Sequence, residues 1–161
     1  MHAYYLLLGS NLGDRKNFIE NAISSISSEV GEIEHSSSFY ETEPWGFLDQ
    51  PMFLNRAIIV HSHKSPFEVL EILTSIERKY GNKSETRYGP RNLDIDILYC
   101  DTMVIDAPNL KIPHPNLYER NFVLVPLMEI AGDFMDPTLN ITVDEIYDQC
   151  KDRQDVFLFD E

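Results

Sequence analysis

The chain has 161 residues, of which 43% are hydrophobic and 11% aromatic, so its length and composition fit a single globular domain over residues 1–161. Its formal net charge of −14 argues against binding to nucleic acid or to an anionic membrane, because both attract basic surfaces. There is no signal-peptide pattern and no apolar run of about eighteen residues, so we expect a soluble, cytoplasmic protein. The sequence does not indicate a protein partner. Cys100 and Cys150 are too few for a disulfide framework or a zinc site, and we interpret both as packing residues.

The first part of the chain predicts strand, helix and strand. Ala3 to Leu8 is an apolar run typical of a buried strand, and it ends at a glycine-bounded turn over residues 9–14. That turn lacks the Gly-Lys-Ser/Thr of a P-loop, so we do not expect it to cradle phosphate. Asp14 is placed to cap a helix from Arg15 to about Ser28, and a second strand is expected from Glu32 to Glu41.

The next segment, Thr42 to Pro51, is a proline-punctuated loop that holds the single tryptophan, Trp45. A tryptophan in such a loop is either a packing anchor or a ligand contact, and the sequence leaves both open. The strand predicted from Phe53 to His63 has Phe53 and Asn55 on the same face. An aromatic ring beside a carboxamide suits a flat heterocycle, although Phe53 alone would be interpreted as a core residue.

Ser65-Pro66-Phe67-Glu68 is a capping box with proline at the first helical position, and the helix that it opens should stop at Gly81. Five of the thirteen Lys and Arg residues of this acidic chain lie within fourteen positions just before Asp94, at 78, 79, 83, 87 and 91. They are either a charged helix end running into a loop or the counter-charge for a polyphosphate.

The alternating residues from Leu93 to Tyr99 predict a strand with Leu93, Ile95, Ile97 and Tyr99 on one buried face. Asp94 and Asp96 then point the same way from Cα atoms roughly 6.6 Å apart. Paired carboxylates are either two ordinary surface aspartates or a Mg²⁺ site, and the neighbouring arginines favour the metal site. Two such ions about 4 Å apart can clamp both oxygens of a phosphoryl displacement.

The remainder of the chain should add a strand or hairpin arm and further helices. The hairpin is expected over residues 102–112, and His114 follows it between two prolines that fix its position. A helix follows Arg120, with Pro126 near the start of its regular part, and a capping box at Thr142 opens another helix. The acidic terminal residues are expected to fray. The whole order predicts an α+β, ferredoxin-like βαββαβ sandwich with additional C-terminal helices.

Three motifs resemble those of the 6-hydroxymethyl-7,8-dihydropterin pyrophosphokinases of folate biosynthesis. They are Gly9-Ser10-Asn11-Leu12-Gly13, Arg87-Tyr88-Gly89-Pro90-Arg91-Asn92-Leu93-Asp94-Ile95-Asp96, and Pro113-His114 followed by Arg120-Asn121-Phe122-Val123-Leu124-Val125-Pro126-Leu127. The order and spacing match over nearly the whole chain, and the second motif is highly specific. The resemblance implies transfer of the terminal diphosphate of ATP to the hydroxymethyl group of the pterin, which gives AMP.

The resemblance also implies roles for individual residues. Arg91, Asp94 and Asp96 would be catalytic, and the two aspartates would hold two Mg²⁺ ions. The residues that it implies for ATP binding are Glu77, Lys83, Arg87, Tyr88, Arg91, Ile97, His114 and Arg120. Those that it implies for pterin binding are Thr42, Pro44, Trp45, Phe53, Asn55 and Phe122, with the two phenylalanines stacking on the ring.

This sequence departs from the family pattern at three places. The loop after the second helix offers only Lys83 where arginines are usual, Tyr88 stands where tryptophan is frequent, and Pro115 stands where a tyrosine can occur. A lysine cannot replace the forked contacts of an arginine, so Arg87 could take over that role.

Two other functions are compatible with the same elements. One is a ferredoxin-like ligand-binding or regulatory module without catalysis, and the other is a metal-dependent nucleotide hydrolase. A mere binding module does not need the aspartate pair with its arginines. The aromatic site around Asn55 favours a second, flat substrate over simple hydrolysis.

Overall fold

A computed structural model describes residues 1–44, 49–80 and 92–159. Its centre is an antiparallel sheet in the order β5-β1-β4-β3-β8, with β2 also paired to β4. The strands of this sheet are β1 (His2–Ser10), β2 (Glu32–Ser36), β3 (Tyr40–Thr42), β4 (Phe53–Ser62), β5 (Asp94–Cys100) and β8 (Val156–Leu158).

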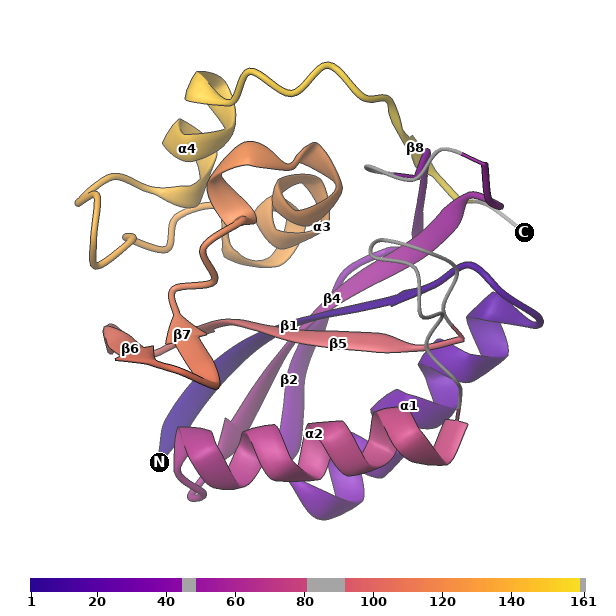
Figure 1. The fold of residues 1–161 in the computed structure, drawn as a ribbon. Helices are drawn as coiled ribbons and strands as arrows, with labels where there is room; N and C mark the ends of the chain where they lie inside the picture. Colours follow the sequence, from indigo (N-terminus) through magenta and orange to yellow (C-terminus); the bar gives the residue numbers. More distant parts are fainter. Residues whose placement is uncertain (45–48, 81–91, 160–161) are drawn as a thin grey trace.

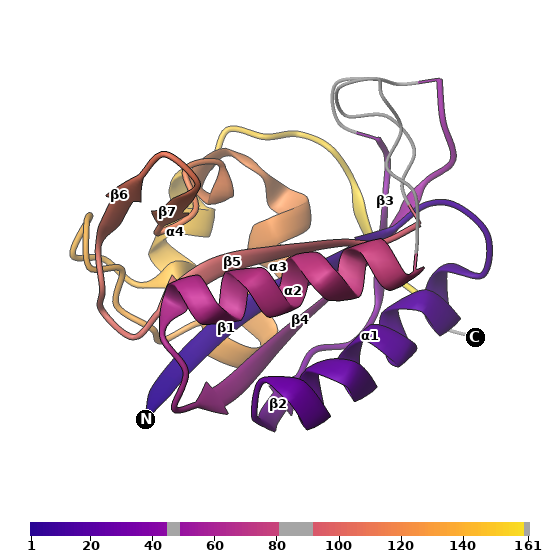
Figure 2. The same cartoon turned by 60° about the horizontal axis from the view of Figure 1, so that its bottom comes forward.

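Helices cover both faces of the sheet (Figures 1 and 2). The helices α1 (Arg15–Glu29) and α2 (Pro66–Tyr80) lie on one face, and α3 (Asn121–Ala131) with α4 (Val143–Gln149) beside it lies on the other. A small hairpin of β6 (Ile105–Ala107) and β7 (Leu110–Ile112) and a short 3₁₀ turn, η1 (Leu117–Glu119), connect β5 to α3. The fold is therefore a mixed arrangement of helices around an antiparallel sheet. Within the described residues, no helix is long and apolar enough to cross a membrane.

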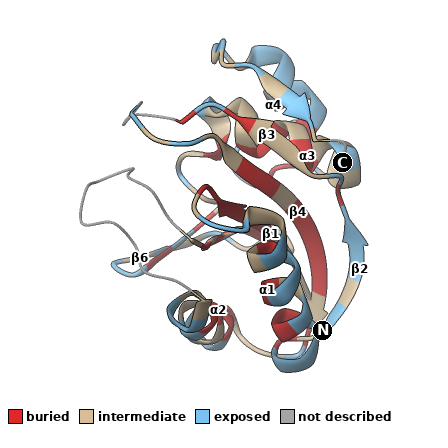
Figure 3. Ribbon diagram, turned by 90° about the vertical axis from the view of Figure 1, so that its right-hand side faces the viewer, coloured by how far each residue is buried: buried red, intermediate tan, exposed pale blue. Residues whose placement is uncertain are grey.

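The core has two parts, one on each face of the sheet. Leu6 and Leu8 of β1 pack with α1 and α2, whereas Leu7 between them packs with α3 and α4. The same alternation in β4 places Ile58 in the first part and Ala57 in the second. Because β1 and β4 are covered on both faces, they are buried almost throughout, as the red stretches of Figure 3 show.

Local signals fixed the helix starts as the sequence predicted. The side chain of Asp14 accepts a hydrogen bond from the backbone N–H of Asn17, three residues into α1. The reciprocal hydrogen bonds of a capping box join Ser65 to Glu68 at the start of α2 and Thr142 to Glu145 at the start of α4. These three predictions are confirmed.

The single strand expected from Glu32 to Glu41 is wrong, because the segment is divided into β2 and β3. Ser37 makes the break: its N–H donates to the carbonyl of Ala57, and its hydroxyl accepts from the N–H of Ala57. The hydroxyl of the buried Ser37 thus takes the place of the backbone carbonyl that would accept from β4 in a continuous strand.

Three further expectations are corrected. Tyr99 does not share a face with Ile97, because Leu98 is an extra residue opposite β1, and this bulge turns Tyr99 toward α3. Pro126 lies well inside α3, which already begins at Asn121. The acidic end does not fray throughout, since Val156–Leu158 pairs with Tyr40–Thr42 as β8.

Candidate active site

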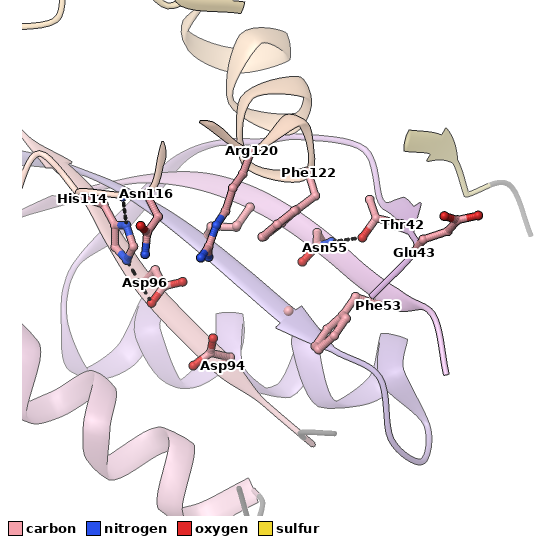
Figure 4. Close-up of a pocket in the computed structure, with 12 residues that line it drawn as sticks. Thr42, Glu43, Phe53, Asn55, Asp94, Asp96, His114, Asn116, Arg120 and Phe122 are labelled. Atoms are coloured by element: carbon pink, nitrogen blue, oxygen red, sulfur yellow. Dashed lines mark hydrogen bonds and ion pairs between the residues drawn. The ribbon is translucent and has the colours of Figure 1, made fainter. Parts of the chain in front are cut away.

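A pocket opens on the α3 face of the sheet, where β1, β3, β4 and β5 meet the start of α3 and the loop after β7 (Figure 4). Its walls are formed by Leu7, Gly9, Thr42, Glu43, Phe53, Asn55, Asp94, Asp96, His114, Asn116, Arg120 and Phe122.

The floor of the pocket is set by strand register. Gly9 of β1 pairs with Asp94 of β5 on one side and with Asn55 of β4 on the other. Leu7, two residues earlier on the same face, pairs with Asp96. Directly paired residues point to the same face of a sheet, so the aspartates and the carboxamide share the pocket with only a glycine between them. The missing side chain of Gly9 leaves the middle of the floor hollow.

His114 stands at the acidic end of the pocket. Its backbone N–H donates to the carbonyl of Leu98, the bulged residue of β5, at 3.0 Å. Its Nδ1 accepts a 3.2 Å hydrogen bond from the backbone N–H of Asn116, which leaves Nε2 as the protonated nitrogen of the neutral ring, and this Nε2 lies 3.8 Å from Asp96 Oδ1. Burial and the nearby charge of Arg120 lower the pKa of His114, although Asp94 opposes the shift.

Arg120 lies between the two ends of the pocket (Figure 4). It is the residue immediately before α3, and its guanidinium carbon lies 5.6 Å from the centre of the Phe122 ring. A forked cation next to a donor imidazole and two carboxylates is the set of groups that a phosphate with bound divalent cations requires.

The other end of the pocket is aromatic and amide-lined. Asn55 is only 3% exposed, and its Nδ2 donates a 3.0 Å hydrogen bond to Oγ1 of Thr42, which is 1% exposed. Figure 4 shows Phe53 and Phe122 at this end, away from the aspartates. A buried amide with flanking rings can bind a flat, polar ring by stacking and by hydrogen bonds.

The pocket therefore brings together most of the described residues that the sequence predicted for the site: Thr42, Phe53, Asn55, Asp94, Asp96, His114, Arg120 and Phe122. Three others lie apart from its lining. Glu77 accepts a 2.9 Å hydrogen bond from the N–H of Ile95, Ile97 is buried in the core under α1 and α2, and Pro44 accepts from Gln154. Trp45, Lys83, Arg87, Tyr88 and Arg91 lie outside the described residues, and their roles stay predictions.

Sequence reasoning missed four lining residues, Leu7, Gly9, Glu43 and Asn116. The sequence analysis predicts a turn at Gly9 and includes the residue in a family motif, but it gives Gly9 no role in the site. Its place between Asp94 and Asn55 depends on the register of three strands, and the sequence alone carried no signal for that register.

The two ends of the pocket, one suited to a phosphate with divalent cations and one suited to a flat ring, fit a transferase that acts on a phosphorylated and a flat substrate. The model of the family described as 7,8-dihydro-6-hydroxymethylpterin-pyrophosphokinase (HPPK) matches residues 5–132. The chain belongs to this family, and it is a pyrophosphokinase, a transferase of folate biosynthesis.

Single relatives agree with the family match. A 2-amino-4-hydroxy-6-hydroxymethyldihydropteridine pyrophosphokinase of Bacillus subtilis is 42% identical over 128 residues, covering 79% of this chain and 77% of its own. An enzyme of the same name from Porphyromonas gingivalis is 39% identical over 135 residues, covering 81% of this chain and 92% of its own.

Some relatives are much longer. The chain covers 24% of a mitochondrial folate synthesis bifunctional protein of Arabidopsis thaliana, to which it is 42% identical over 135 residues. A crystal structure of wild-type HPPK-DHPS from Plasmodium falciparum with pteroate matches with a TM-score of 0.75 and 16% identity over 92% of this chain and 42% of that one. At this identity the structural likeness establishes the fold alone.

Proposed function

We propose that the pocket binds 6-hydroxymethyl-7,8-dihydropterin at its aromatic end and the phosphates of ATP at its acidic end. The enzyme then transfers the terminal diphosphate of ATP to the pterin hydroxymethyl group and releases AMP. The observation that carries the proposal is the row Asp94, Gly9, Asn55 across three neighbouring strands. A flat ring bound over this floor has the Asn55 carboxamide at one edge and the Asp94 and Asp96 carboxylates beyond the opposite edge. Its hydroxymethyl substituent can therefore reach the phosphates of ATP.

At the aromatic end, the hydrogen-bond inventory suits a pterin. Asn55 uses its Nδ2 on Thr42, so its Oδ1 can accept from the amide and amino donors of the ring. The Thr42 hydroxyl accepts from Asn55 and can donate its own proton to a ring acceptor. Phe53 and Phe122 supply the stacking faces, and Pro44 and Trp45 are proposed to complete this end.

At the acidic end, His114 and Arg120 are proposed to donate to phosphate oxygens. The lowered pKa of His114 keeps the ring neutral near pH 7, so it acts as a hydrogen-bond donor through Nε2 while Arg120 supplies positive charge. Lys83, Arg87, Tyr88 and Arg91 are proposed to add further nucleotide contacts, with Arg91 also stabilising the transferred charge. Glu77 is proposed to contact the nucleotide at the outer edge of β5, and Ile97 through its backbone at the same edge, because the side chain of Ile97 is buried in the core.

Asp94 and Asp96 would hold two Mg²⁺ ions. The donor set fits, because both carboxylates are half-buried, lie on one face of β5 and open into the same pocket. When bound, such ions neutralise phosphate charge and lower the proton affinity of the attacking hydroxyl. The chain itself aligns the hydroxyl with the β-phosphorus and keeps the phosphates in place, and the reaction needs no side-chain nucleophile.

We also infer that β1, α1, β2 with β3, β4, α2 and β5 form a ferredoxin-like βαββαβ core, to which α3, α4 and β8 are added. Residues 1–161 would then act as a single pyrophosphokinase domain, with every proposed substrate contact supplied by this one chain.

The direct test is to incubate the purified protein with ATP, Mg²⁺ and 6-hydroxymethyl-7,8-dihydropterin and to quantify AMP and pterin diphosphate by chromatography. Equal amounts of both products, and no AMP when the pterin is omitted, are expected. ADP with free phosphate would indicate a nucleotide hydrolase. Intact ATP together with bound pterin would indicate a ligand-binding module, and either result would refute the proposal.

A further inference from the structure

The C-terminal segment of residues 151–159, here called the C-terminal strap, runs from the end of α4 to the sheet edge beside β3 (Figure 1, in yellow). It follows the residues that the family model matches, which end at residue 132. Two groups of its contacts lie beside the pocket, at the first turn of α3 and at the strand and loop around Thr42, and both segments carry lining residues. Farther along the strap, the N–H of Phe159 donates to the carbonyl of Phe39.

Asn121, the first residue of α3, joins the strap to that helix. Its backbone N–H donates to Asp152 Oδ2 at 2.8 Å, and its Nδ2 donates to the backbone carbonyls of Asp152 at 2.9 Å and Gln154 at 3.4 Å. The flanking residues of Asn121 are Arg120 and Phe122, which both line the pocket. The strap therefore holds the helix turn that presents one wall.

The other end of the strap holds the segment around Thr42, which forms another part of the lining. Val156 pairs with Thr42 in the β3·β8 ladder, and the Nε2 of Gln154 donates a 3.0 Å hydrogen bond to the carbonyl of Pro44. Thr42 and the next residue, Glu43, line the pocket. Gln154 is thus linked to Asn121 through its backbone and to the β3 loop through its side chain.

We propose that the C-terminal strap is a positioning element that sets where the first turn of α3, which carries Phe122, lies relative to the strand and loop at Thr42. Among the residues that the strap holds, Phe122 and Thr42 belong to the aromatic end and only Arg120 belongs to the acidic end, so the strap acts mainly on recognition of the flat substrate. This inference rests on the proposed function, because it assumes that the aromatic end receives the pterin.

Gln154 and Asn121 are the residues through which the strap can be loosened without disturbing the core. The Oε1 of Gln154 is buried and has no hydrogen-bond partner among the described residues. Gln154→Met keeps the length of the side chain nearly constant. It removes the hydrogen bond to Pro44 and, at the same time, the unsatisfied Oε1 acceptor, so we expect no large loss in the free energy of unfolding. Asn121→Ala removes the two side-chain bonds to the strap. Asp155→Asn, an exposed position on the same strap, is the matched control.

The first measurement is steady-state kinetics of the double variant Asn121→Ala/Gln154→Met in the full chain. Loss of these three hydrogen bonds is expected to raise KM for the pterin about three- to tenfold. Arg120 also adjoins Asn121 but is only one of several proposed phosphate contacts, so KM for ATP should rise by no more than about twofold. Asp155→Asn should match the wild type. Equal increases in both KM values, or an unchanged pterin KM with folding intact, would overturn the proposal.

Hydrogen exchange without substrates gives a readout that does not depend on the reaction. The double variant should exchange faster than the wild type at residues 40–44 and 121–124, while β1 and α1 keep their protection. If the double variant and the wild type exchange at the same rate at residues 40–44 and 121–124, the strap does not hold these segments, whether or not the enzyme is active. If the wild type makes no pterin diphosphate, the proposed function fails, and the exchange result still decides whether the strap holds the two walls.

Discussion

Gly9 and Asn55 face each other across β1 and β4 so closely that a Cβ atom on Gly9 would lie 2.8 Å from Asn55 Oδ1. Asn55 has little freedom to retreat, because it is buried and its Nδ2 is bonded to Thr42. A glycine is therefore required at position 9 because a larger side chain would displace the Asn55 carboxamide. The backbone conformation does not require a glycine, since residue 9 lies in the regular strand β1.

Gly9→Ala should consequently impair pterin binding more than folding. The methyl group would displace the Asn55 carboxamide and fill the hollow floor, so we expect KM for the pterin to rise about tenfold, comparable to the loss of one good polar contact. The measurement is steady-state kinetics with circular dichroism as a fold check.

Gly132→Ala is the matched control for this substitution. A Cβ at Gly132 would also meet a carboxylate oxygen closely, Asp144 Oδ1 at 2.6 Å, but Asp144 is exposed and can move, and neither residue lines the pocket. Normal pterin KM in Gly9→Ala, or an equal defect in Gly132→Ala, would contradict the role given to Gly9.

The parts of the site that the sequence predicted depend on local rules. Alternation in a strand placed Asp94 and Asp96 on one face, and the same rule placed Phe53 beside Asn55. Three side-chain caps gave the starts of α1, α2 and α4, because a cap needs only residues three apart. The resemblance to a family then grouped these residues into one site.

The parts that could not be predicted depend on pairing between distant segments. The bulge at Leu98 turns Tyr99 to the α3 face and gives His114 its backbone acceptor, and it exists only in the register of β5 against β1. The strand β8 pairs with the edge that β3 offers. The residues from Val156 to Phe159 favour a strand, but the sequence does not show which strand would pair with them. The hollow at Gly9 likewise follows from the pairing of β1 with both neighbours.

Asp96→Asn should nearly abolish turnover while the fold survives. The substitution keeps the size of the side chain and removes the charge that a divalent cation requires, so we expect kcat to fall at least about a hundredfold and activity to need more Mg²⁺. Asp94→Asn should behave alike. Kinetics over a Mg²⁺ titration, with a chelator-treated sample as reference, measure both effects.

The control for the aspartate variants is Asp106→Asn. Asp106 is exposed on β6 and pairs with Lys111, so its substitution changes the same charge outside the pocket. Near-normal kcat in Asp96→Asn, with an unaltered Mg²⁺ dependence, would exclude this carboxylate as a metal ligand.

Asp101 should make stability depend on pH at the end of the sheet remote from the pocket. Burial alone raises the pKa of Asp101, but the N–H of Ala3, donating at 2.8 Å, and the imidazole of His2 outweigh it, so the pKa is lowered. A carboxyl group with a lowered pKa stabilises the fold above its unfolded pKa of about 3.9, and this contribution is lost as the pH falls through the folded value.

Asp101→Asn tests this linkage, and asparagine tolerates the positive φ of 48° found there. Because the carboxylate is 38% exposed, solvent screening limits the expected loss to about 1 kcal/mol at pH 7. Urea unfolding at pH 7 and pH 3 should give a difference between variant and wild type that shrinks at the lower pH. A difference that is constant with pH would mean that the carboxylate charge contributes nothing.

Asp136 should be the most sensitive polar residue for folding, because it satisfies four donors at a fully buried position. Its Oδ2 accepts from the hydroxyls of Tyr99 at 2.5 Å and Tyr118 at 2.8 Å, and its Oδ1 accepts from the backbone N–H groups of Thr138 and Leu139. Burial, followed by the bond to this carboxylate, raises the pKa of both tyrosines, so both remain protonated donors.

Asp136→Ala leaves these donors without their acceptor and opens a small cavity, so we expect a loss of about 3 kcal/mol in the free energy of unfolding. Asp133→Ala, at an exposed position before Phe134, should change it by less than about 0.5 kcal/mol. Urea unfolding of both variants measures the contrast. Tyr99 belongs to β5 and Tyr118 to the turn before Arg120, so the Asp136 cluster connects the strand that carries the two aspartates to the start of α3. Equal stability of the Asp136→Ala and Asp133→Ala variants would show that the cluster does not stabilise this connection.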